Sequence, residues 1–304
     1  MVQKLNRRSS PKARARAVFQ RLTEKYPNVG TFLTHQNSFE LLIAVILSAQ
    51  CTDERVNKTT PGLFERFPME AVYAMHNIPG IPVGKFAVKS GPMMAAFDIF
   101  ELTVTGQGGH AAMPHLTIDP VVIGTKIVDA YQTVISRIID PIEPAVLSVT
   151  QFHGGDAYNV IPNEVEIKGC TRCFSPQVQG KLETEMKRIA NEICAAWGAT
   201  CEFKYERRYP PTINSDQEAR LAGDVAIEIA GPENVNLRPK PAMGSEDFAY
   251  MLQEKPGAYI WIGNGDGEGS CMVHNPGYDF NDEILPIGAT WFVRMAEKSL
   301  PPID

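Results

Sequence analysis

The sequence lacks a long apolar run. The longest, residues 41–47, lies between Glu40 and Asp53 and is far shorter than the roughly 20 residues of a membrane-spanning helix. The basic N-terminal residues are not followed directly by an apolar stretch, so we expect neither a secretory signal nor a membrane association. Residues 41–47 are better explained as part of a buried helix.

Cysteine is also scarce, with six in 304 residues. Irregular spacing in a chain of this length excludes the disulfide framework of small secreted domains and favours reduced thiols in a cytoplasmic protein. Cys170 and Cys173 stand in a strand-like run, where positions three apart face opposite sides, so we expect no zinc or redox site at that pair. The six are Cys51, Cys170, Cys173, Cys194, Cys201 and Cys271.

Charge is unevenly distributed along the chain. Residues 1–62 carry 10 Lys/Arg and 4 Asp/Glu, a balance of +6, whereas residues 63–304 carry 19 and 31, a balance of −12. Such a break suggests two segments with different histories or partners. The 44% of hydrophobic residues excludes a disordered chain, and the length suits roughly two domains of about 100–200 residues.

Hydrophobic periodicity and turn residues predict the secondary structure. At the N-terminus helices are predicted over 11–26, 39–50 and 53–67, and residues 79–92 interrupt regular structure. From 98 to 209 the predicted order is β-α-β-β-α-β, the ferredoxin-like arrangement. Its elements are a strand at 98–105, a helix at 120–139, strands at 145–152 and 165–174, a helix at 176–197 and a strand at 200–209. The elements predicted beyond it are a helix at 216–230, a short helix after 243–247, a strand at 258–263 and a helix at 286–299.

Three of the six histidines lie in surroundings that point to a site. His76 and His274 are predicted in loops ordered by proline and glycine, where a rigid backbone can hold an imidazole toward a ligand. His110 follows the predicted strand 98–105 in a glycine-rich segment. The other histidines, His35, His115 and His153, are interpreted as structural or solvated.

Five motifs in unbroken order carry a resemblance to a known family. They are MHNIPGIPVG at 75–84, GQGGHAAMPH at 106–115, GGDAYNVIP at 154–162, GSEDF at 244–248 and VHNPGYDFND at 273–282. With them, residues from about 62 to 304 resemble the hippurate hydrolase and N-acyl-amino-acid amidohydrolase branch of the binuclear-metal aminoacylase and carboxypeptidase superfamily.

The predicted helices and this resemblance together imply an α/β (α+β) fold in three parts. A short helical segment, 1–67, precedes a partial metallopeptidase-type catalytic domain formed by 68–97 and 210–304. A ferredoxin-like lid, 98–209, is inserted into it and is expected to form a homodimer. The implied reaction is cleavage of an amide bond of a small N-acyl amino acid, with divalent metal ions of the zinc, manganese, nickel or cobalt class.

Site residues are carried over one position at a time. His76 and His274 match metal-binding histidines. His110 matches a lid histidine that polarises the scissile carbonyl, often from the partner subunit. Asn159 and Arg172 resemble positions that hold the substrate carboxylate or the oxyanion, and an arginine can bind a carboxylate through two parallel hydrogen bonds.

The chain departs from the family in the groups that activate water. The family also uses a Cys-Gly-His-Asp-type motif and a pair of glutamates, and the sequence contains no Cys-x-His and no Glu-Glu. We therefore expect an incomplete metal site and absent or very weak catalysis, with a partial domain that exposes apolar residues 258–262. The alternative is a non-enzymatic remnant that dimerises through the lid.

Residues from 12 to about 67 resemble a different family, the endonuclease III type of DNA glycosylase. The resemblance lies in residues 39–57, where Gln50 matches a glutamine that enters the DNA stack. The catalytic lysine and aspartate and the cluster cysteines of that family do not follow, so DNA binding of the glycosylase type, with Gln50 as its contact, is the least favoured alternative. Residues 62–68 fit both families, which suggests a chimeric fusion joined there.

Overall fold

In the computed structural model, residues 33–36, 44, 48, 52–66, 70–267 and 271–300 are described. The chain divides into two compact units, Met1–Met69 and Glu70–Asp304. The helix predicted over 11–26 and most of the helix predicted over 39–50 lie outside the described residues. The predicted division of the second unit into lid and catalytic parts stays a prediction.

The first unit contains helix α3, Asp53–Arg66, which confirms the helix predicted there. Asp53 and Glu54 occupy its first turn, where carboxylates interact favourably with the exposed backbone N–H groups. Val56 is buried in a small cluster with Leu33 and Ala44. This cluster is the apolar contact of the unit among the residues that the structure describes.

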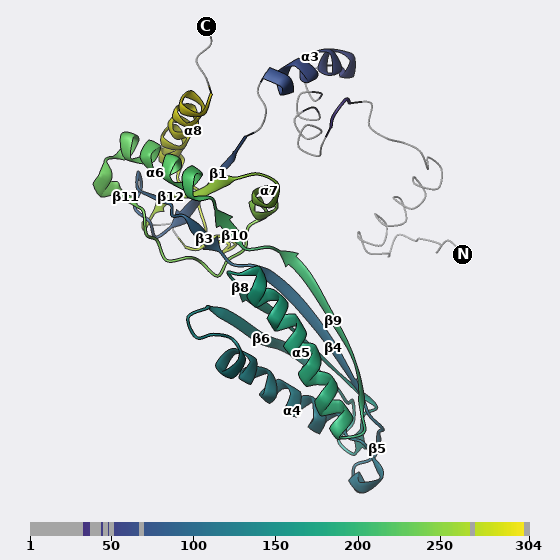
Figure 1. Ribbon diagram of the computed structural model, residues 1–304. Helices are drawn as coiled ribbons and strands as arrows, with labels where there is room; N and C mark the ends of the chain where they lie inside the picture. Colours follow the sequence, from purple (N-terminus) through teal and green to yellow (C-terminus); the bar gives the residue numbers. More distant parts are fainter. Residues whose placement is uncertain are drawn as a thin grey trace. The chain divides into compact units, whose positions relative to one another are not determined.

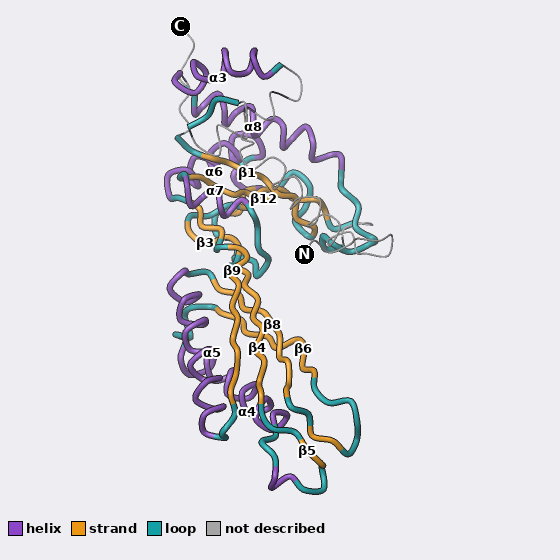
Figure 2. The backbone as a smooth tube through the Cα atoms, turned by 90° about the vertical axis from the view of Figure 1, so that its right-hand side faces the viewer, coloured by secondary structure: helices purple, strands orange, loops and turns teal. Residues whose placement is uncertain are grey.

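One sheet of the second unit follows the predicted β-α-β-β-α-β order. Its strands lie in the order β6-β8-β4-β9, the ferredoxin-like order, and both helices cover one face (Figures 1 and 2). The elements are β4 (Phe97–Thr105), α4 (Pro120–Thr133), β6 (Ala145–His153), β8 (Glu164–Cys173), α5 (Pro176–Ala196) and β9 (Thr200–Tyr209). Strands β5 (Gly109–His110) and β7 (Val160–Ile161) form a separate pair. We call residues 97–209 the ferredoxin-like region.

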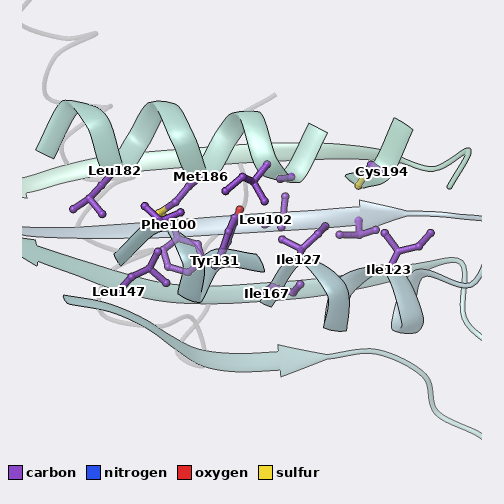
Figure 3. Packing of buried hydrophobic residues seen from close by; sticks show 14 of the residues in the cluster. Phe100, Leu102, Ile123, Ile127, Tyr131, Leu147, Ile167, Leu182, Met186 and Cys194 are labelled. Carbon is purple, nitrogen blue, oxygen red and sulfur yellow. The ribbon is translucent and has the colours of Figure 1, made fainter. Parts of the chain in front are cut away.

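Local signals explain why the two helices begin where they do. The side chain of Asp119 accepts a hydrogen bond from Val121 N at 2.9 Å, and Pro120 occupies the first turn of α4. Ser175 caps α5 in the same way, and Gly198 follows its end at a φ of 74°. Between helices and sheet, buried side chains such as Phe100, Leu182 and Met186 interdigitate, as Figure 3 shows.

The other large sheet has the strand order β1-β12-β2-β11. Its strands are β1 (Val72–Pro79), β2 (Phe86–Ala87), β11 (Val235–Asn236) and β12 (Gly257–Gly265), with helices α6 (Asp216–Ala230), α7 (Phe248–Glu254) and α8 (Leu285–Ser299) around them. Two short strands, β3 (Gly91–Met94) and β10 (Thr212–Asn214), pair with each other next to the ferredoxin-like region.

Strand β12 overturns the expectation that residues 258–262 would be exposed. All nine of its residues are buried, because β12 lies between β1 and β2 and one face packs on α6 and α8. Trp291 of α8 is fully buried in that cluster, and its Nε1 donates to Ala222 O at 3.1 Å. In the part of the chain that the structure describes, no helix has the length and apolarity to cross a bilayer.

Candidate functional site

His76 lies in strand β1, so the prediction that it stands in a loop is wrong. Residues 72–78 pair in parallel with β12, and His76 is opposite Trp261. The turn formed by the proline and glycine residues begins only at the end of the strand, after Pro79. His76 Nδ1 is 2.7 Å from the carbonyl oxygen of Asn77, so Nδ1 carries the proton and Nε2 keeps its lone pair for a ligand.

His274 is exposed in the loop 271–281, as its predicted loop position required. Its φ of 69° is the only positive φ of a non-glycine residue in the described part of the chain. Such left-handed backbone is costly for a side-chain-bearing residue and persists where neighbouring contacts impose it. The loop therefore holds His274 in a defined backbone conformation.

Hydrogen bonds join the His274 loop to the strand ends beside His76. Asn77 Nδ2 donates to the hydroxyl of Tyr278 and to Asn264 Oδ1 at 3.3 Å. Asn264 Nδ2 in turn donates to Asp279 O at 3.1 Å. Since Asn77 and Asn264 lie near the carboxyl ends of the parallel strands β1 and β12, the structure places both histidine-bearing segments at the same edge of the sheet.

The two histidines supply fewer ligands than a catalytic metal needs. A catalytic zinc typically has three protein ligands. Across the described ranges, no group of three or more His, Cys, Asp or Glu side chains is arranged to hold a metal ion. Two imidazoles at one sheet edge do not by themselves fit a dinuclear centre.

A phenol to which the sequence assigned no role lies near His76 and is hydrogen-bonded to a carboxylate. Tyr259 OH donates to Glu246 Oε2 at 2.6 Å, and the Tyr259 ring centroid is 6.3 Å from that of His76. Burial is the larger cause, and the hydrogen bond to Glu246 the smaller, of a pKa of Tyr259 that lies well above its ordinary value. Glu246 belongs to the GSEDF motif, and this motif was the sequence signal that could have identified it. Its hydrogen bond with Tyr259 of β12 could not be predicted from the sequence.

His110 and Asn159 are brought together on the β5–β7 pair. His110 is opposite Val160, and Ala111 N donates to Asn159 O at 3.0 Å. Ala112 N donates to His110 Nδ1 at 3.1 Å, so the ring proton is on Nε2, which can act as a donor. Both views place β5 at the end of the ferredoxin-like region away from β1 and β12 (Figures 1 and 2). The structure therefore does not bring His110 to His76 within one chain.

Arg172 lies on β8 and contacts the loop that carries Glu246. Its Nη1 donates to Met243 O at 2.7 Å and to Ser245 Oγ at 3.0 Å. Its guanidinium carbon is 4.5 Å from the centroid of the Phe97 ring, within the range of a cation–π contact. Arg172 thus stands with the GSEDF loop and not with Asn159. Gln50 lies outside the described residues.

The comparisons with known proteins decide the family. A family model described as peptidase family M20/M25/M40 matches residues 35–298. The chain belongs to this family. This agrees with the predicted fold class and with the resemblance of residues 62–304, whereas the endonuclease III resemblance of residues 12–67 stays a prediction.

The chain is similar to several named proteins. The chain is 34% identical to thermostable carboxypeptidase 1 of Saccharolobus solfataricus over 76% of this chain and 58% of the relative. It is 35% identical to N-acetylcysteine deacetylase of Bacillus subtilis (75% and 58%) and 33% identical to hippurate hydrolase of Campylobacter jejuni (79% and 62%). The chain therefore spans less than two thirds of the length of these relatives.

Solved M20 structures share the fold. The crystal structure of the Bacillus subtilis YXEP protein, a dinuclear metal binding peptidase from the M20 family, superposes with a TM-score of 0.65 at 28% identity. The match covers 82% of this chain and 62% of that one.

Proposed function

We propose that this chain is an amidohydrolase of the M20 family that acts on small N-acyl amino acids, and that its activity is impaired. Three of its relatives are named for a carboxypeptidase, a deacetylase of N-acetylcysteine and a hydrolase of hippurate. The substrates named for the last two are acylated amino acids, which supports a substrate of that class. The impairment is part of the proposal because the sequence contains neither the Cys-x-His nor the Glu-Glu that the family uses to activate water.

The observation that carries this proposal is the attachment of the His274 loop to β1. Hydrogen bonds from Asn77 to Tyr278, and from Asn264 to Asp279, hold that loop at the end of the strand that bears His76. In this proposal His76 Nε2 and the His274 imidazole supply two ligands of a divalent cation of the zinc, manganese, nickel or cobalt class. Among the described residues, no third His, Cys, Asp or Glu completes a set of three ligands.

Substrate contacts are proposed for three residues of the ferredoxin-like region. Arg172 donates from Nη1 to Met243 O and to Ser245 Oγ. Its other guanidinium N–H groups are left to bind a carboxylate. His110, with its proton on Nε2, can donate to a polarised carbonyl oxygen. Asn159 lies beside it and is proposed to contact the same oxyanion.

Because His110 is remote from His76 in one chain, we propose that it acts in the site of a second copy. Its surroundings expose large apolar side chains that a homodimer would cover. They are Met113, Leu116, Tyr158 and Val160. Exposed apolar side chains gathered in this way are typical of an interaction surface.

One observation favours the non-enzymatic alternative, a chain that only dimerises. The core cluster of the ferredoxin-like region draws all its residues from 96–205, so this part is able to persist without a working site. Metal binding separates the two proposals, since the remnant has no need of His76 and His274 as ligands.

The test is calorimetric titration of the purified chain with zinc or manganese, followed by an assay on N-acetyl and N-benzoyl amino acids. We expect weak cation binding that is lost in His76→Ala and in His274→Ala and kept in the matched control His153→Ala, which alters an exposed histidine of β6. Hydrolysis should be slow. Binding that is absent, or equal in all variants, contradicts the ligand assignment, and fast turnover that depends on His76 contradicts the impairment.

A further inference from the structure

A cavity of about 520 Å³ lies where strand β12 ends. Its lining includes Asn264 and Gly265, the last two residues of β12, and the turn that carries Pro82 and Val83. Residues 279–282, at the end of the His274 loop, complete the wall. Small-molecule sites in proteins typically have volumes of about 300–1,000 Å³. The cavity is therefore large enough for a small molecule or for a long side chain of a substrate.

The cavity adjoins the sheet edge at which the two histidine-bearing segments meet. Asn264 is only 2% exposed, and its Oδ1 accepts hydrogen bonds from Asn77 Nδ2 at 3.3 Å and from Asn281 N at 3.0 Å. Asn77 directly follows His76 in β1, and Asn281 lines the cavity. One buried amide thus joins the cavity wall to the strand that bears His76, so an occupant of the cavity lies beside the proposed cation site.

Hydrogen bonds fix both walls of the cavity to β12. On one side, Gly265 N donates to Ile81 O at 2.9 Å, which holds the turn against the strand. On the other side, Asn264 Nδ2 donates to Asp279 O at 3.1 Å, and Asn281 Nδ2 donates to Asn264 O at 3.2 Å. Because the walls are bonded to the sheet before any ligand arrives, binding has a low cost in conformational entropy.

The lining residues give the cavity a negative charge. Three of them, Asp266, Asp279 and Asp282, are exposed carboxylates, and none of the lining residues is basic. Among the residues that the structure describes, no ion pair includes any of these three aspartates. Carboxylates gathered in a hollow without a basic neighbour attract a cation.

The rest of the wall favours an organic cation over a metal ion. Pro82, Val83 and Phe280 contribute apolar surface, which can contact a hydrocarbon stem, and an aromatic ring can also bind an ammonium or guanidinium group on its face. A metal ion needs several oxygen ligands within bonding distance. In the described ranges no three or more His, Cys, Asp or Glu side chains have that arrangement. The lining therefore fits a charged group at the end of an apolar stem, as in lysine and arginine.

We propose that this cavity binds the side chain of a basic amino acid, so that Nα-acyl-lysine and Nα-acyl-arginine are the preferred substrates within the N-acyl amino acid class. The inference rests on the proposed function, because the amide bond is assigned to the site beside His76 and only the side chain to the cavity. Asp279 and Asp282 hold the cationic group, and Val83 and Phe280 contact the stem. Exposed ion pairs each contribute little, so the preference over an uncharged side chain of equal length is about 3–10-fold.

The first measurement examines the cavity alone. The full-length chain, without added metal, is titrated with agmatine, which carries an ammonium and a guanidinium group on a hydrocarbon stem and has no acyl group. Ligand-observed NMR follows the binding. We expect saturable binding that weakens about 3–10-fold in the double variant Asp279→Asn/Asp282→Asn and is unchanged in the matched control Asp129→Asn, at an exposed carboxylate of α4. No saturable binding to the unaltered chain, or equal binding to the double variant, overturns the proposal.

The second measurement compares Nα-acetyl-lysine with N-acetylnorleucine, whose side chain has the same carbon stem without the ammonium group. We expect Nα-acetyl-lysine to bind the unaltered chain about 3–10-fold more tightly, and equal affinity overturns the substrate assignment even if a variant does not fold. Agmatine binding without binding of either acetylated amino acid overturns that assignment through the proposed function. The reverse result overturns the cavity alone, so the two failures are distinguishable.

Discussion

Asn77 donates a hydrogen bond to the hydroxyl of Tyr278, joining the strand that carries His76 to the loop that carries His274. The two residues are far apart in the sequence, so this bond closes a long segment of chain at one sheet edge. The proposed cation site depends on this hydrogen bond, because it holds the two histidine-bearing segments together and a catalytic metal needs more than one protein ligand.

Removing the Tyr278 hydroxyl tests that connection. Tyr278→Phe takes away the acceptor of Asn77 but keeps the ring, so the free energy of unfolding should fall by about 1 kcal/mol and the affinity for zinc should fall with it. Chemical denaturation and calorimetric titration measure the two effects. Tyr158→Phe, at a fully exposed ring, is the control and should change neither. Unchanged zinc affinity in Tyr278→Phe would show that the loop position does not depend on this bond.

A buried carboxylate should give the stability of the ferredoxin-like region a pH dependence. Asp98 is buried on β4, where it accepts hydrogen bonds from Gln179 Nε2 at 2.9 Å, from Tyr205 OH at 2.8 Å and from Arg208 N at 3.3 Å. Burial raises the pKa of its carboxyl above the ordinary value of 3.8, and the hydrogen bonds from Tyr205 and Gln179 offset part of that rise. The folded state therefore binds the proton more tightly than the unfolded state.

From this sign, the contribution of Asp98 to stability is full below its ordinary pKa and is lost as the pH rises through the raised, folded-state pKa. Asp98→Asn cannot titrate, so the difference in free energy of unfolding between the unaltered chain and this variant should shrink as pH rises. Urea unfolding between about pH 3 and about pH 6 measures it. Parallel curves, or a difference that grows with pH, would contradict the raised pKa.

Gly169 of β8 permits a close approach of the neighbouring strand. A Cβ built at this position would lie 2.0 Å from Ser148 O and 2.7 Å from atoms of the Phe100 ring. Gly169→Ala should therefore cost about 1–3 kcal/mol or more through overpacking. Gly62→Ala is the matched control, because nothing lies within 4 Å of a Cβ there and alanine favours a helix. Thermal unfolding that is equally affected by both changes would rule out this packing account.

The proposed dimer predicts a change of mass in solution. Leu116 is 62% exposed beside the β5–β7 pair, and Leu116→Ser should weaken self-association and shift the light-scattering mass toward the monomer. Ile142→Ser, at a residue that is 84% exposed elsewhere in the ferredoxin-like region, should leave the mass unchanged. A chain that is monomeric before any substitution excludes the proposal that His110 serves a second copy.

Local sequence signals were sufficient for most of the ferredoxin-like region. Asp119 and Ser175 cap helices whose starts they predicted, and alternation located β4 because one of its faces is buried. Strand β1 could not be predicted from its local sequence, because the proline and glycine residues that follow His76 are typical of a loop. Alternation is also weak there, since six of its eight residues are half-buried.

The features that could not be predicted depend on contacts between segments that are separated in the sequence. The burial of β12 follows from its place between β1 and β2, which no local pattern records. The Glu246–Tyr259 hydrogen bond and the Asn77–Tyr278 hydrogen bond likewise join residues whose proximity depends on strand order and loop path. Residue types alone could indicate candidate site residues, but they could not predict which of these residues form hydrogen bonds with one another.

The most direct test of the account is anomalous X-ray diffraction from crystals of the chain grown with zinc. The account predicts a zinc peak about 2.0–2.1 Å from His76 Nε2, with His274 as a second ligand. A peak at another position, or well-ordered density for both imidazoles with no zinc between them, would contradict it.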